Sequence, residues 1–143
     1  MVAKNATIAR RLASQMWGVV QTQLKVADGI WSYTTAGHGG FIVDIYLHPE
    51  LAEYKSVVYR DRRTNEYFPS EQHFAPFEED CEYAKVIWLY PYVLKKLSKN
   101  YSKVDKTNFE KWQQEQLGYA KRSLEQWNPD FLQKHPKHGK LIK

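Results

Sequence analysis

The sequence predicts an α+β fold, in which an antiparallel meander of three to four strands packs against helices and a long C-terminal helix follows. Apolar and polar side chains alternate over residues 19–26, which is the period of a strand with one buried face. Asp28 and Gly29 come next, and this pair favours a two-residue hairpin turn. Farther along, apolar residues recur at helical spacing: Phe77, Cys81, Ala84 and Trp88.

Length and composition limit the domain organisation. With 143 residues, the chain is long enough for one domain with its own core and short for two. We therefore expect a single α+β domain over residues 1–132 and a basic, flexible tail over residues 133–143. No apolar run reaches the roughly 18 residues of a membrane span, and the N-terminus lacks the apolar core of a signal peptide. We expect a cytoplasmic protein without membrane contact.

The first expected element is a short amphipathic helix over residues 5–16. Its apolar stripe has a four-residue spacing: Ile8, Leu12 and Met16. Either Asn5 or Thr7 is suited to cap its N-terminus. Because a helix of this length is marginal alone, we expect it to pack on the strands that follow.

Three strands are expected after this helix, over residues 19–26, 30–35 and 41–46. In the third strand Asp44 alternates with apolar neighbours, so we expect its side chain on the wetter face or at the edge of the sheet. Pro49 then opens a short helical segment to Tyr54, because a proline in the first helical turn loses no hydrogen bond.

The stretch before the next helix is less regular. Residues 55–59 are a candidate fourth strand, and residues 67–76, with two prolines and no periodicity, predict an irregular connection. The next helix is expected to begin at Phe77, with an acidic first turn that the helix dipole favours. It should end near Tyr90, because Pro91 cannot continue it.

The last helix is expected over residues 109–127. Thr107 and Glu110 have the spacing of a capping box. Asn128 and Pro129 are residue types that end a helix.

Three glycines surround His38 between two predicted strands. Glycine allows positive φ or the close approach of another group. We therefore expect this segment to have a backbone conformation or a close contact that other residues would not permit. One interpretation places His38 at the exposed tip of a tight turn. The other makes it a binding or catalytic histidine on a loop that a sheet holds in place.

We expect His38 to meet the acidic run that opens the predicted second helix. The candidate catalytic residues are His38, Glu78, Glu79, Asp80 and Cys81. Cys81 and His38 could form a nucleophile pair, but a buried, inert thiol on the apolar stripe is the alternative we favour. The carboxylates and His38 could hold Zn²⁺ or Mn²⁺, or simply lock the loop by a hydrogen bond. We predict the hydrogen bond, with no metal and no cofactor.

The net charge is +5, and lysines gather between residues 95 and 106. Such a surface attracts acidic protein surfaces or phosphate groups. The candidate binding residues combine these lysines with aromatic anchors: Lys95, Lys96, Lys99, Lys103, Trp112, Tyr119 and Trp127. The sequence has no signature of a known nucleic-acid-binding motif, so nucleic acid stays an alternative partner.

Three blocks of the sequence carry a family resemblance: ADGIWSYTTAGHGGF at residues 27–41, HPE at 48–50 and FEEDCEYA at 77–84. They resemble a family of uncharacterised domains encoded by phages, plasmids and bacterial genomes. The similarity covers residues 17–97, and the chain from Ser98 lies outside it. The family often has tryptophan at the position of Tyr83, so an aromatic ring is kept there. The resemblance implies a mobile-element setting and names no reaction.

We therefore expect a small phage- or plasmid-type accessory protein that binds and inhibits a host defence complex, as anti-CRISPR or anti-restriction proteins do. The sequence has no P-loop, GxGxxG, HExxH or GxSxG motif, which favours binding over catalysis. One alternative is an enzyme that uses His38 with the block from Glu78 to Cys81. Another is a nucleic-acid-associated accessory protein that uses the lysines. The expected partner is a host protein or nucleoprotein complex.

Overall fold

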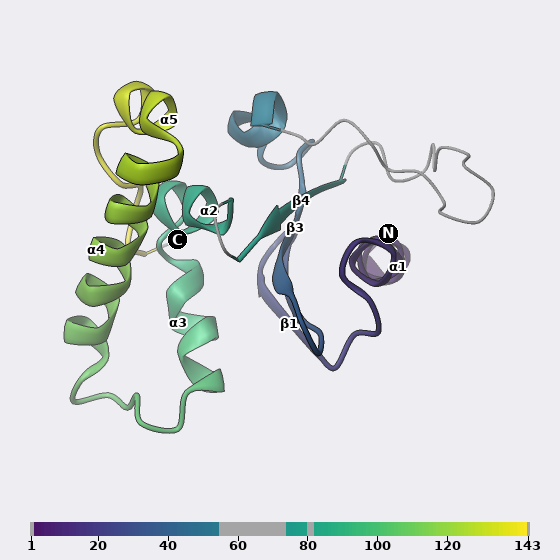
Figure 1. Ribbon diagram of the computed structural model, residues 1–143. Helices are drawn as coiled ribbons and strands as arrows, with labels where there is room; N and C mark the ends of the chain where they lie inside the picture. Colours follow the sequence, from purple (N-terminus) through teal and green to yellow (C-terminus); the bar gives the residue numbers. More distant parts are fainter. Residues whose placement is uncertain (1, 55–73, 80–81, 143) are drawn as a thin grey trace. The chain divides into compact units, whose positions relative to one another are not determined.

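The structure is a computed structural model that describes residues 2–54, 74–79 and 82–142 (Figure 1). Contacts within the chain group it into two compact units, Met1–Glu78 and Glu79–Lys143. Each unit is described by itself. The expectation of one domain over residues 1–132 stays a prediction.

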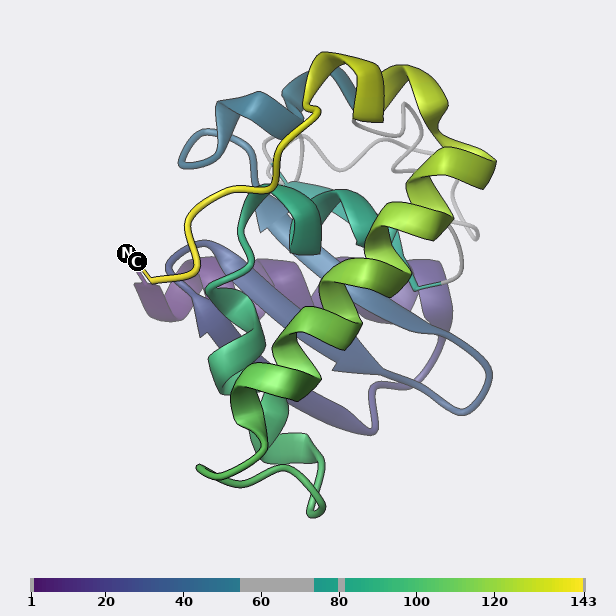
Figure 2. The ribbon, with the colours of Figure 1, turned by 90° about the vertical axis from the view of Figure 1, so that its left-hand side faces the viewer.

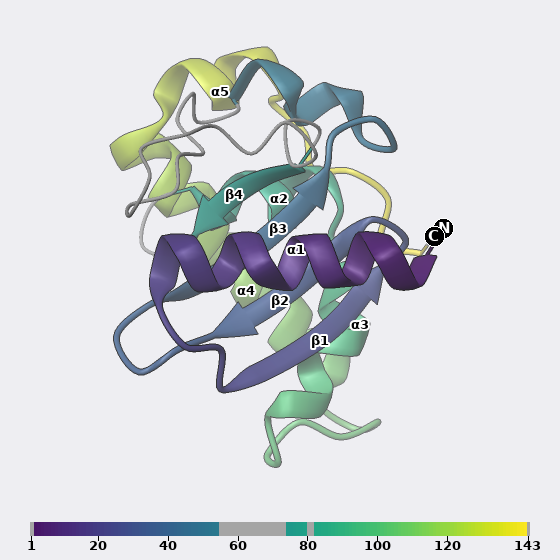
Figure 3. The same cartoon turned by 90° about the vertical axis from the view of Figure 1, so that its right-hand side faces the viewer.

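The first unit is a four-stranded antiparallel sheet with a helix across it. Its elements are α1 (Val2–Trp17), β1 (Thr22–Ala27), β2 (Ile30–Thr34), β3 (Gly39–Asp44), the 3-10 helix η1 (Pro49–Tyr54) and β4 (Phe74–Glu78). The strands lie in the order β1-β2-β3-β4. Figure 3 shows α1 lying across one face of this sheet. The predicted meander and the α+β class are confirmed.

The turn between β1 and β2 forms at Asp28 and Gly29, as predicted. Gly29 has a φ of +75°, and a Cβ at this position would lie 2.8 Å from Leu47 Cδ1 and 3.2 Å from Asp44 Cβ. The His48 imidazole donates from Nε2 to the Asp28 carbonyl at 2.7 Å. This hydrogen bond links the chain after β3 to the hairpin turn between β1 and β2. His48 of the HPE block therefore has a structural role.

The core of the first unit lies between α1 and the sheet. Its buried residues come from α1, the connection to β1, and three strands: Ile8, Ala9, Leu12, Ala13, Trp17, Val20, Trp31, Tyr33, Ile42 and Phe74. The apolar stripe of the first helix thus packs on the strands, as predicted. The prediction of Asn5 or Thr7 as its cap is wrong, because α1 begins at Val2 and includes both residues.

The opposite face of the sheet is also apolar. Cross-strand partners share a face, and the partners on this side are buried: Ile30, Phe41, Val43, Ala75 and Phe77. Every residue of β3 is buried, so this strand is buried on both faces. Such a strand shows little alternation between apolar and polar residues.

Two predictions near β3 and β4 are wrong. Phe74–Glu78 is a strand paired with β3, where we expected an irregular connection and then a helix from Phe77. Pro76 is compatible with this strand because β4 is at the edge of the described sheet, where a missing N–H is tolerated. Asp44 is not on a wet face, since it is only 5% exposed. Its carboxylate accepts the Tyr46 N–H at 2.9 Å and so shapes the turn after β3. The candidate strand at 55–59 lies outside the described residues.

The second unit is helical. Its elements are α2 (Tyr83–Leu89), α3 (Val93–Leu97), the 3-10 helix η3 (Ser98–Asn100), α4 (Phe109–Trp127) and α5 (Pro129–Lys134). α4 packs against α2 and α5 (Figure 2), and its buried side chains form one stripe: Gln113, Leu117, Ala120 and Leu124. α2 ends before Pro91 and α4 ends before Asn128, as predicted. No helix in the described part of the chain has the length and hydropathy needed to cross a bilayer.

The predicted capping box at the start of α4 is wrong. Asn108 is the N-cap residue and makes no side-chain capping bond. Its amide instead donates to the Lys103 carbonyl at 2.8 Å and accepts the Asp105 N–H at 2.8 Å. The side chain that would cap the helix is therefore used to close the preceding loop.

Residues 135–139 contact the end of α2. The Trp88 indole donates from Nε1 to the His135 carbonyl at 2.7 Å, and the Gly139 N–H donates to the Trp88 carbonyl at 2.8 Å. The His138 ring meets the Trp88 ring edge-on, with centroids 5.7 Å apart. Whether the wider segment 133–143 is flexible stays a prediction.

Candidate functional site

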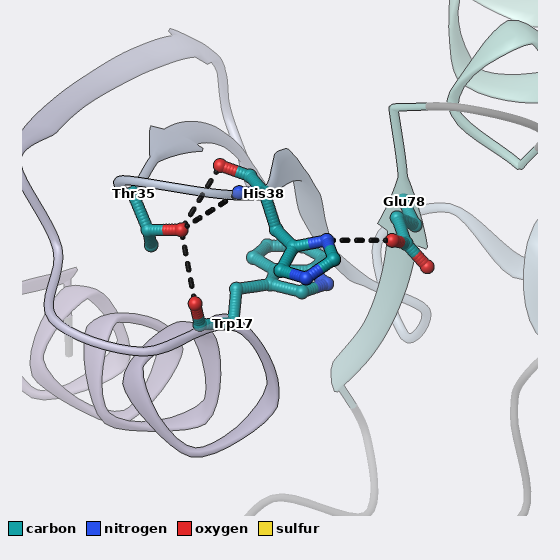
Figure 4. A network of polar contacts seen from close by, with 4 residues as sticks. All are labelled: Trp17, Thr35, His38 and Glu78. Atoms are coloured by element: carbon teal, nitrogen blue, oxygen red, sulfur yellow. Dashed lines mark hydrogen bonds and ion pairs between the residues drawn. The ribbon is translucent and has the colours of Figure 1, made fainter.

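His38 and Glu78 form a pair at one end of the sheet. The imidazole donates from Nδ1 to Glu78 Oε1 across 3.1 Å (Figure 4). Both side chains are open to solvent, with exposed fractions of 54% for His38 and 39% for Glu78. Because water screens such a pair, its contribution to stability is small.

The loop that carries His38 is fixed by Thr35 rather than by the imidazole. The buried Thr35 hydroxyl lies 2.9 Å from the Trp17 carbonyl and 3.0 Å from the His38 carbonyl, and it accepts the His38 N–H at 3.1 Å. The Thr35 N–H also donates to the His38 carbonyl at 2.8 Å. This side chain therefore connects the turn to the last residue of α1, as Figure 4 shows.

Among the glycines around His38, Gly40 is required by the backbone. Gly40 has a φ of +154°, and a Cβ there would overlap the Phe77 carbonyl oxygen and lie 3.0 Å from Glu78 Cα. Gly37 has nothing within 4 Å of such a Cβ. The special backbone expected from the sequence is thus the close approach of β4 at Gly40, the same approach that brings Glu78 to His38.

The expected acidic neighbours are only partly described. Glu78 is the last residue of β4, Glu79 is exposed, and Asp80 and Cys81 lie outside the described residues. The described residues contain no group of three or more His, Cys, Asp or Glu side chains that could hold a metal ion. A solvent-exposed His–carboxylate pair can exchange a proton or accept a hydrogen bond from a ligand. The pair therefore adds a weak contact between the turn and β4, while Thr35 fixes the turn itself.

A polar row of residues lies on the α1 face next to this pair. Register places Gln23, Tyr33, Gly40 and Glu78 opposite one another on four consecutive strands. The Tyr33 hydroxyl is buried and has no hydrogen-bond partner among the described atoms. Burial raises the pKa of Tyr33 well above its ordinary value, against a smaller lowering by Arg10, so the phenol is neutral at physiological pH. Sequence reasoning overlooked Tyr33 and Thr35, because neither stands out until the register is known.

We predict that Thr35→Val destabilises the protein more than His38→Ala. The valine would leave the Trp17 carbonyl and the His38 N–H without their buried partner, which costs about 2 kcal/mol. Loss of the exposed His38 pair should cost less than about 1 kcal/mol. Urea denaturation of both variants measures the two free energies of unfolding. An equal or larger loss for His38→Ala would show that the imidazole holds the turn.

The lysines expected to bind a partner are in the second unit. Lys95 and Lys96 are exposed on α3, Lys99 is exposed on η3, and Lys103 is exposed on the following loop. The second unit contains 13 Lys and Arg residues against 8 Asp and Glu residues, whereas the first unit contains 8 of each. The entire net charge of +5 therefore belongs to the second unit.

The loop after η3 is ordered by its own polar groups. The Asp105 carboxylate accepts the Thr107 N–H at 2.8 Å, the Thr107 hydroxyl at 2.5 Å and the Asn108 N–H at 3.2 Å. These bonds, that of the Thr107 hydroxyl first, lower the pKa of the Asp105 carboxyl below its ordinary value. The carboxylate therefore stabilises the loop above the ordinary carboxyl pKa, and this stabilisation is lost as the pH falls through the lowered one. The lysines on either side are presented by a preorganised backbone.

The three aromatic candidates differ in their surroundings. Tyr119 and Trp127 are exposed, at 55% and 60%. Trp112 is half-buried, with its ring centroid 5.5 Å from that of Tyr101 and 6.1 Å from that of Phe109. Tyr101, an exposed ring beside the lysines that sequence reasoning overlooked, is a further candidate anchor.

The aromatic ring that replaces the expected tryptophan also lies in the second unit. Burial, with smaller effects from Tyr101 and Glu79, raises the pKa of Tyr83 to about 12. Its phenol is therefore neutral at physiological pH and contributes no negative charge near the lysines.

Together these features define a small α+β protein with an exposed His–carboxylate pair on its sheet and a lysine-rich helical surface. Residues 10–139 match the family described as Domain of unknown function (DUF7007), and the chain belongs to this family. The expectation of an uncharacterised domain family is thereby confirmed. The match continues past residue 97 and includes α4, so the expected end of the similarity at residue 97 is wrong. No curated protein and no solved structure matches the chain.

Proposed function

We propose that the protein acts by binding an acidic surface of a host protein complex, as a phage- or plasmid-encoded inhibitor of a defence system of the anti-CRISPR or anti-restriction kind. The mobile-element setting rests on the resemblance of residues 27–41, 48–50 and 77–84 to domains encoded by phages and plasmids. The observation that carries the binding surface is the confinement of the net charge to the second unit. A cluster of exposed lysines speeds encounter with an acidic partner.

The arrangement of charges favours a protein over a nucleic-acid backbone. The exposed carboxylates of Asp105 and Glu110 lie within the lysine-rich stretch 95–111. A phosphate backbone would be repelled by them, whereas a protein surface can offer charges of both signs. The exposed Tyr101 ring next to Lys99 and Lys103 is the kind of apolar anchor that protein interfaces use.

The proposed function predicts that four charge reversals abolish defence inhibition. Bacteria that carry a restriction or CRISPR system are transformed with the gene and challenged with phage, and the efficiency of plating is measured. The wild-type protein should raise the efficiency of plating of the phage. This effect should disappear when glutamate replaces four lysines: Lys95, Lys96, Lys99 and Lys103. The control replaces Lys134, Lys137, Lys140 and Lys143 by glutamate, which changes the net charge equally and should preserve inhibition.

The partner is then identified by affinity capture from cells that carry the inhibited defence system. The affinity of the protein for the purified partner is measured at several salt concentrations. A protein interface should lose mainly association rate as salt rises and keep most of its affinity. A steep, log-linear fall in affinity would indicate phosphate neutralisation and thus the nucleic-acid alternative. Failure of the wild-type protein to raise plating against every system tested would contradict the inhibitor function.

The enzyme alternative is favoured by one observation, the 3.1 Å contact between His38 and Glu78. It predicts that His38→Ala abolishes function in a protein that stays folded. The binding function predicts that this variant retains inhibition, because the imidazole lies on the first unit, away in sequence from the lysines. The plating assay with His38→Ala, accompanied by a melting curve, separates the two.

A further inference from the structure

The outer face of α4 is lined by polar and charged side chains. It lies opposite the buried stripe of the helix, and in Figure 2 α4 runs in front of α2 and α3. A shallow hollow of about 380 Å³ lies on this face, lined by Lys111, Gln114, Glu115, Gly118, Tyr119 and Arg122. Gly118 is near the middle of α4.

Gly118 has no reason within the chain to be glycine. Its φ is not positive, and a Cβ would meet only Arg122 Nη1, at an ordinary contact distance of 3.5 Å. Glycine in the middle of a helix is unfavourable relative to alanine. A glycine that the chain itself does not need, among the residues that line a hollow, permits the close approach of another backbone.

The charges on this face are self-complementary about Gly118. Lys111 lies seven residues before Gly118, and Glu125 lies seven residues after it. Glu115 lies three residues before, and the basic pair Lys121 and Arg122 lies three and four residues after. A two-fold axis at Gly118 would therefore place each acidic residue opposite a basic one.

These charges are also available for such a contact. Within the described ranges, Lys111, Glu115, Lys121 and Glu125 make no ion pair, although an i, i+4 partner is present on the helix for each. The Arg122 guanidinium lies over the Tyr119 ring, 4.9 Å from its centroid, so the side chain follows the helix surface instead of extending into solvent. All of these positions except the half-buried Gly118 are exposed.

We propose that two copies of this chain associate through α4, with the helices antiparallel and crossing at Gly118. Lys111 of each copy then pairs with Glu125 of the other, and Glu115 with Lys121 or Arg122. The contact is isologous, so each pair occurs twice. A helix of 19 residues is about 28 Å long, which places the interface at the small end of specific interfaces, about 1,000 Å². The dimer is therefore weak and sensitive to salt.

Sedimentation velocity over a range of protein concentrations tests the proposal. The wild-type chain should change from monomer to dimer as concentration rises, and the change should need more protein in high salt. Lys111→Glu alone and Glu125→Lys alone should each weaken self-association by about tenfold or more, because each places two like-charge pairs in the dimer. The control Lys137→Glu, outside α4, should associate like the wild type.

Mixing the two variants gives the sharpest outcome. A heterodimer of Lys111→Glu with Glu125→Lys restores an opposite-charge pair at both contacts, so the mixture should dimerise where neither variant does. Gly118→Leu should weaken the dimer while raising the melting temperature of the helical unit, since leucine is the better helix former. A wild-type chain that is monomeric at every concentration would overturn the proposal, and so would a mixture no more associated than its components. These readouts do not involve defence inhibition, so the proposed dimer stands or falls independently of the proposed function.

Discussion

Gly40→Ala should destabilise the first unit by about 3 kcal/mol, a large part of the stability of a small domain. The added methyl would overlap the Phe77 carbonyl oxygen and crowd Glu78 Cα, and alanine disfavours the φ of +154°. Neither strain can relax locally, because Gly40 lies in the inner strand β3, paired with Tyr33 of β2 on one side and with Glu78 of β4 on the other. Urea denaturation followed by circular dichroism measures the loss.

The matched control is Gly37→Ala in the same turn. A Cβ at Gly37 meets nothing within 4 Å, and its backbone is not in the left-handed region. We expect a change within about 0.5 kcal/mol, as for an ordinary surface substitution. If both alanines cost the same, the close approach of β4 at Gly40 would not be the reason for the glycine-rich segment.

The strand β4 shows why this sequence predicts some elements better than others. Local signals were sufficient for the Asp28–Gly29 turn and for the ends of α2 and α4, because turn residues and prolines act on their own backbone. β4 has no such signal, since Phe77 continues the helical spacing of Ala84 and Trp88 by coincidence. Its pairing with β3 is a long-range contact, and only the assembled sheet reveals it.

The contact between His38 and Glu78 could be predicted from the sequence, but the residues that hold these two side chains in place could not. A histidine between glycines and an acidic run suggested the contact that His38 makes with Glu78. The sequence placed Glu78 on a helix, whereas β4 supplies it. Thr35 could not be identified from the sequence, because its hydroxyl acts on the Trp17 carbonyl 18 residues earlier. Buried polar contacts of this kind depend on tertiary structure.

Gly139→Ala should release the C-terminal segment from α2. A Cβ at Gly139 would overlap the Leu89 carbonyl oxygen and lie 2.8 Å from Leu89 C. The alanine therefore cannot keep the hydrogen bond from the Gly139 N–H to the Trp88 carbonyl. Because the segment also accepts the Trp88 indole N–H and places the His138 ring against it, its loss would expose a tryptophan that is now buried.

The expected cost is about 2 kcal/mol, from two hydrogen bonds and the apolar surface of Trp88. This is less than for Gly40→Ala because a terminal segment can detach without breaking the helices. Hydrogen exchange should show faster exchange of the Gly139 amide and of the end of α2, with the sheet unchanged. Trp88→Phe, which removes the indole N–H donor and part of the ring but leaves the Gly139 N–H bond to the residue 88 carbonyl, should loosen the segment less. Unchanged exchange at residue 139 in Gly139→Ala would mean that the segment does not hold α2 in solution.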